Sequence, residues 1–75
     1  MDNFYDYNIT KREREVLLLA IRGYSNSRIA RELVVSVSTV KAHLESIYRK
    51  LRVHNKIQAS VKVIFDGIVN REDVS

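Results

Sequence analysis

Residues 25–51 read SNSRIARELVVSVSTVKAHLESIYRKL and contain two stretches with helical spacing of apolar residues. The first follows Ser25, a favourable N-cap, and its apolar residues share one face: Ile29, Ala30 and Leu33. The second follows Ser36, another N-cap, and its apolar residues fall at i, i+4, i+7 and i+11: Val40, Leu44, Ile47 and Leu51. The pattern predicts helices over residues 26–33 and 37–51.

A short helix, a tight turn and a longer helix with small and basic residues at its start are typical of a helix-turn-helix. Ala30 is the small residue expected where the two helix axes approach each other. Val34 stands where many such turns have glycine, so we expect a slightly different turn at this position.

The flanking segments predict two further helices. Thr10 and Glu13 have the spacing of a capping box before a helix over residues 11–22, which Gly23 can end in a left-handed conformation. Apolar residues predict a last helix over residues 56–66. The fold class is therefore all-α: a compact four-helix domain at residues 10–67, between tails at 1–9 and 68–75.

Composition excludes several classes of protein. The chain has 75 residues, which is one domain at most, and no cysteine, so it has neither disulfides nor thiol chemistry. No apolar run approaches the roughly 18 residues of a membrane span, and the acidic N-terminus is not a signal peptide. No nucleophile–base set, metal-ligand cluster or phosphate loop can be assembled. We expect a cytoplasmic protein that is not an enzyme and needs no cofactor.

The positive charge is concentrated in the centre of the chain. The net charge is +4, but residues 11–56 hold eleven bases and four acids, a local charge of +7. A basic centre between mildly acidic ends favours a polyanion as the partner, although many surface helices are basic only for solubility.

One face of the longer predicted helix carries groups that can recognise DNA. Ser38 and Thr39 lie in the first turn, where hydroxyls and free N–H groups suit phosphate oxygens. Lys41 can donate to guanine, and the Ala42 methyl can touch a thymine methyl. Glu45 can accept from cytosine N4, or repel the backbone and narrow the choice of sites. The alternative is an ordinary solvated helix face.

Four segments in order resemble the LuxR-type DNA-binding domain, as in GerE-like and NarL-like regulators. ITKREREVL at residues 9–17 resembles Leu-Thr-x-Arg-Glu-x-Glu-Val-Leu, and GYSNSRIA at 23–30 resembles Gly-x-Ser-Asn-x-Glu-Ile-Ala. SVSTVKAH at 36–43 matches Ser-x-x-Thr-Val-Lys-x-His, and KLRV at 50–53 matches Lys-Leu-x-Val. The resemblance covers residues 9–65 in unbroken register.

The resemblance implies that the third helix enters the major groove. Carried over by position, the base-reading residues are Lys41, Ala42 and Glu45. The positions that correspond to backbone contacts are Asn26, Ser38, Thr39 and Lys56. Arg28 and Arg49 are added because their charges can reach phosphate. Arg28 stands where the family commonly has Glu, so Ser25 loses a capping-box partner. Glu45 stands where many members have a base or an amide, so the DNA sequence that is read is expected to differ.

The last helix has two apolar faces. Ala59 and Val63 suit the core, and a second stripe consists of Ile57, Val61, Ile64, Phe65 and Ile68. Either Ile64 and Phe65 pack under the N-terminal tail, or the stripe is the face of a two-fold homodimer, which is how the family often pairs.

These observations favour a sequence-specific regulator of transcription that binds double-stranded DNA, with RNA polymerase as a further implied partner. A chain that starts with Met and lacks room for a second domain resembles a stand-alone regulator, unless it is an excised C-terminal domain. The alternatives are region 4 of a sigma factor, and a protein-interaction adaptor built on the same helices.

Overall fold

Residues 7–65 are described by the computed structural model, with the side chain of Phe65 excepted. This part forms helices α1 (Lys11–Ile21), α2 (Asn26–Leu33), α3 (Val37–Leu51) and α4 (Lys56–Phe65), and it contains no strand. The all-α prediction is confirmed. Helix α1 ends one residue before the predicted boundary because Arg22 is its cap, and the predicted end of α4 at Asp66 lies outside the described residues.

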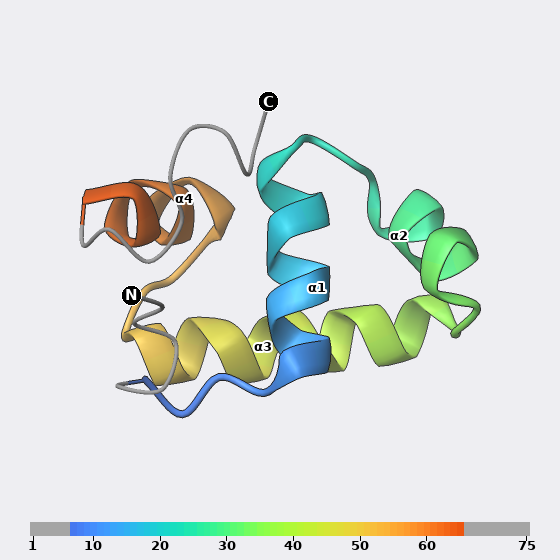
Figure 1. Cartoon of the computed structure of the whole chain (residues 1–75), viewed down its shortest axis with the longest axis horizontal. Helices are drawn as coiled ribbons and strands as arrows, with labels where there is room; N and C mark the ends of the chain where they lie inside the picture. The colour runs from blue at the N-terminus through green and yellow to red at the C-terminus, as the bar shows by residue number, and fades with distance from the viewer. Residues whose placement is uncertain (1–6, 66–75) are drawn as a thin grey trace.

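The long helix α3 supports the other three (Figure 1). Helix α1 crosses it near its middle, while α2 and α4 lie toward its two ends, and each of the three contacts α3. Their apolar faces meet in one core, whose largest fully buried side chains are Val16, Leu17, Ile29, Val40, Ile47, Leu51 and Val63. Ala30, the small residue expected where the axes of α2 and α3 approach each other, is buried in this core.

The predicted caps start the first three helices. The Thr10 hydroxyl accepts from the Glu13 N–H at 3.0 Å, and the Glu13 carboxylate accepts from the Thr10 N–H at 2.9 Å, which completes the capping box. Ser25 and Ser36 accept from the backbone N–H groups three residues later at 3.1 and 3.0 Å. The starts of α2 and α3, which flank the turn, are therefore fixed by local hydrogen bonds.

Helices α1 and α2 end in the same hydrogen-bond pattern. Gly23, directly after the Arg22 cap of α1, has φ +94°, and its N–H donates to the Ala20 carbonyl at 3.0 Å. Val34 ends α2 with φ 56° and ψ 50°, and its N–H donates to the Arg31 carbonyl at 3.3 Å. The expectation of a different turn is wrong, because Val34 adopts the left-handed conformation that glycine would take. A β-branched residue seldom adopts this conformation, which costs roughly 1–2 kcal/mol.

A buried ion pair joins α1 to the end of α3. The Lys50 ammonium donates to the Glu13 carboxylate at 2.7 Å and to the Asn8 carbonyl at 3.0 Å. Burial raises the pKa of Glu13, but hydrogen bonds from Lys50, Ser46 and the Thr10 backbone and the charge of Lys50 outweigh it, so the pKa falls from 4.5 to about 2. In the sequence Lys50 stood out only as the first residue of the KLRV segment. The structure gives it a structural partner.

Candidate nucleic-acid interface

The outward face of α3 presents the predicted base-reading residues to solvent. Lys41, Ala42 and Glu45 are all exposed, and Arg49 lies one turn beyond them on the same side. Among residues 7–65, neither Lys41 nor Glu45 takes part in an ion pair, so both side chains are available to a ligand.

The first turn of α3 orders one hydroxyl and leaves another exposed. The Thr39 and Ser36 hydroxyls are 2.8 Å apart and share a hydrogen bond, which holds the Thr39 side chain in place. Thr39 is half-buried. Ser38 is exposed beside it. Ordered N–H and O–H groups at the start of a helix are suited to anionic oxygens.

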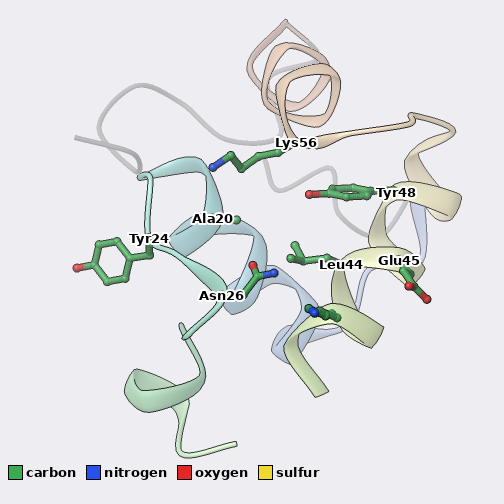
Figure 2. Close-up of a pocket in the computed structure, with 8 residues that line it drawn as sticks. Ala20, Tyr24, Asn26, Leu44, Glu45, Tyr48 and Lys56 are labelled. Carbon is green, nitrogen blue, oxygen red and sulfur yellow. The ribbon is translucent and has the colours of Figure 1, made fainter. Parts of the chain in front are cut away.

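A pocket of about 370 Å³ brings together residues from all four helices and the α1–α2 turn. Its lining residues are Ala20, Tyr24, Asn26, Lys41, Leu44, Glu45, Tyr48 and Lys56. Figure 2 shows Asn26 pointing up into it from α2, and Lys56 reaching over it from the start of α4. Asn26, Lys41 and Lys56, three predicted DNA contacts that lie far apart in sequence, thus line the same pocket. The pocket is not lined by the other predicted site residues: Arg28, Ser38, Thr39, Ala42 and Arg49.

Arg28 has a partner within the chain. Its guanidinium lies over the Tyr24 ring, 3.8 Å from the ring centroid, and the residue is exposed. The cation–π contact holds the guanidinium beside the start of α2, next to the pocket that Tyr24 lines.

Tyr48 is a pocket residue that the sequence reasoning missed. It is half-buried, and desolvation by burial raises its pKa. Its spacing could have identified it, since Lys41, Glu45 and Tyr48 fall at i, i+4 and i+7 on one side of α3. Tyr24, Ala20 and Leu44 carry no comparable signal, because only the packing of α1 against α3 makes them pocket walls.

The polar groups that line this pocket include donors suited to an anion. The two ammonium groups of Lys41 and Lys56 and the amide of Asn26 can donate hydrogen bonds to an anion. In the described range 7–65 no group of three or more His, Cys, Asp or Glu could hold a metal ion. Over the same range no helix has the length and apolar character to span a bilayer.

Helix α4 leaves an apolar face uncovered. Ile57, Val61 and Ile64 are 74%, 49% and 40% exposed, whereas Ala59 and Val63 on the other side are fully buried. The predicted two-faced helix is confirmed over these residues. The other two members of the predicted face, the Phe65 side chain and Ile68, lie outside the described residues.

Comparison with known proteins places the chain in a family. The model of the luxR family of bacterial regulatory proteins matches residues 7–63. YhjB of Escherichia coli is 48% identical over 54 residues, covering 72% of this chain and 27% of that protein. The transcriptional regulatory protein LiaR of Bacillus subtilis is 40% identical over 63 residues, 84% of this chain and 30% of its own length.

The response regulator protein VraR of Staphylococcus aureus is 43% identical over 53 residues, 71% of this chain and 25% of its own length. The chain thus spans less than a third of the relatives it matches. The match to the family model covers all four helices up to Val63, including both helices of the helix-turn-helix. The chain belongs to the luxR family of bacterial regulatory proteins.

Proposed function

We propose that the chain binds double-stranded DNA and regulates transcription, with α3 in the major groove. The observation that carries this proposal is the pocket at which Lys41 of α3, Asn26 of α2 and Lys56 of α4 meet beside an exposed helix face. Family membership and the names of the relatives, which are regulators of transcription, agree with it.

The residues divide into two roles in this proposal. Lys41, Ala42 and Glu45 read base edges, because they share the exposed face of α3 and offer a donor, a methyl group and an acceptor. The backbone contacts, which position α3 and do not read sequence, are Asn26, Arg28, Ser38, Thr39, Arg49 and Lys56. Such a protein would work in the bacterial cytoplasm, on the nucleoid, and would act with RNA polymerase.

Titration of duplex DNA against salt tests the proposal. If about four to six phosphates are neutralised per monomer, the log–log slope of the binding constant is expected near −4 to −5. A flat salt response would contradict DNA binding and favour the protein-interaction adaptor. The sigma-factor alternative has no support in the comparisons, since the matched family model over residues 7–63 is that of the luxR regulators.

We further propose that the chain pairs through α4 as a two-fold dimer. Ile57, Val61 and Ile64 form an exposed apolar stripe, and Phe65 and Ile68 continue it in sequence. Burying one such side chain stabilises a contact by about 1.5–3 kcal/mol, which after association costs gives a weak, roughly micromolar dimer. The operator would then be an inverted repeat with half-sites about 10 base pairs apart.

Sedimentation of Val61→Glu tests the dimer. The variant is expected to sediment as a folded monomer and to bind half-sites without cooperativity, because the charge lies on α4 and not on α3. Val34→Glu is the matched control, since it places the same charge on a valine that is 89% exposed outside α4. Unfolding of Val61→Glu would mean that the stripe belongs to the core. Equal sedimentation of both variants and the parent would also reject the dimer face.

A further inference from the structure

A polar group that the proposed DNA contacts do not use is directed into the pocket at the interface. Figure 2 shows the Tyr48 hydroxyl pointing from α3 into the pocket, below Lys56 and on the side facing Asn26. Tyr48 is half-buried, and among residues 7–65 its hydroxyl has no hydrogen-bond partner. Leaving a partly desolvated hydroxyl without a partner is unfavourable, so the group is suited to an external acceptor.

The Tyr48 hydroxyl has a proton to donate to a ligand. The phenol of a tyrosine is protonated at neutral pH, and burial raises the pKa of Tyr48 further. The neighbouring Lys56 ammonium and Asn26 amide are donors as well. Three donors from three helices around one hollow favour a ligand that is rich in acceptors and negatively charged.

The surroundings of the pocket agree with an anion. Helices α2 and α4 both begin at it, with Asn26 and Lys56 as their first residues, and the start of a helix carries partial positive charge. The one carboxylate of the lining, that of Glu45, is directed away from the Tyr48 hydroxyl and Lys56 in Figure 2. It therefore does not oppose an anion held between them.

We propose that the Tyr48 hydroxyl donates a hydrogen bond to a DNA phosphate that Asn26 and Lys56 also contact. This inference rests on the proposed DNA binding and adds a residue to it. One phosphate would then connect α2, α3 and α4, and would set the depth and register of α3 in the groove. Tyr48 is in this role a backbone-positioning residue, and it reads no base.

The test compares Tyr48→Phe with the parent on a selected site and on random duplex DNA. Removing the hydroxyl is expected to weaken binding to both about tenfold, as for one hydrogen bond to a charged acceptor. The log–log salt slope should stay unchanged, because the phenol is neutral. Lys56→Gln should weaken binding and also reduce the magnitude of the slope by about one.

Tyr24→Phe is the matched control. Tyr24 lines the same pocket, but Figure 2 shows its hydroxyl directed away from the hollow. The change keeps the ring on which Arg28 stacks, so affinity, salt slope and melting temperature are all expected to match the parent.

Each failure has its own meaning. If the parent binds duplex DNA, Lys56→Gln weakens it and Tyr48→Phe does not, the role of Tyr48 is overturned while DNA binding stands. A loss of affinity in Tyr48→Phe that comes with a lower melting temperature would overturn it as well, since that is the result of a packing role. If the parent binds no duplex even at low salt, the proposed function itself fails.

Discussion

Lys41 and Lys50 lie on the same helix, α3, but their surroundings are opposite. The Lys50 ammonium donates to the Glu13 carboxylate and the Asn8 carbonyl, and the two charged side chains are 26% and 5% exposed. Lys41 is exposed, has no ion pair in the described part of the chain, and borders the pocket with Asn26 and Lys56.

The difference separates charges that hold the fold together from charges that remain for a ligand. Lys50 compensates a buried carboxylate, and breaking such a pair leaves an uncompensated charge inside the protein. Lys41 has no ion-pair partner among residues 7–65, so its removal is expected to cost the fold little. The number of basic residues in the sequence does not distinguish these two kinds of charge. Substitutions at Lys50 and Lys41 do.

The largest effect is expected for Lys50→Met. It removes the partner of the Glu13 carboxylate, whose side chain is 5% exposed, and should lower the free energy of unfolding by about 3–5 kcal/mol in a urea titration. Arg49→Met, at the exposed neighbouring position, should change it by no more than about 0.5 kcal/mol. Equal unfolding midpoints for the two variants would show that Lys50 contributes no more to stability than its exposed neighbour, and would contradict a structural role for its charge.

Acid should weaken the same ion pair. The pKa of Glu13 is about 2 in the folded chain against an ordinary 4.5, so the extra stability is complete above pH 4.5 and disappears as the pH falls toward 2. At about 1.4 kcal/mol per pKa unit, this stabilisation amounts to about 3 kcal/mol. The difference in unfolding free energy between the parent and Glu13→Gln should therefore shrink over this range. A constant difference would show that the Glu13 carboxylate is not stabilised by its partners.

Lys41→Ala should affect binding and leave folding unchanged. It is expected to cost roughly 1–3 kcal/mol on the preferred DNA site and to reduce discrimination at one base pair. Lys56→Ala should weaken all sequences about equally, because a phosphate contact does not read bases. Fluorescence anisotropy with specific and random duplexes measures both. If the two variants behave alike on both DNAs, α3 is not the reading helix.

The smallest effect is expected at the turn of the helix-turn-helix. Val34→Gly should stabilise the domain by about 0.5–1 kcal/mol, because relief of the left-handed strain exceeds the added freedom of the unfolded chain. Val34 is 89% exposed, so no packing is lost. Thermal unfolding measures the gain, with Ala42→Gly as the control, which should destabilise α3 by about 1 kcal/mol because that exposed residue lies inside the helix. A loss of stability in Val34→Gly would contradict the strain.

The helices were predictable from local signals, whereas the contacts between them were not. Thr10, Ser25 and Ser36 indicated where helices begin, and apolar spacing indicated which face is buried, since both signals act within a few residues. The role of Lys50 depends on Glu13, which is far away in sequence, and no local pattern connects them. The Val34 turn was mispredicted because Val34 adopts the left-handed conformation, which a β-branched residue seldom takes.

The candidate site was predictable to a similar extent. Helical periodicity placed Lys41, Ala42 and Glu45 on one exposed face. The resemblance to the LuxR-type domain supplied Asn26 and Lys56, which no spacing rule connects to α3. Their meeting at one pocket, with Tyr48 between them, depends on how α1, α2 and α4 pack around α3.

The most direct test of this division of charges is a titration of the isotope-labelled chain with duplex DNA, followed by amide chemical shifts. The largest shifts are expected along the exposed face of α3 and at the starts of α2 and α4, around Lys41, Asn26 and Lys56. Amides around Glu13 and Lys50 should hardly move, because their charges are already paired. Shifts that centre on Glu13 and Lys50, or no shifts at low salt, would contradict the account.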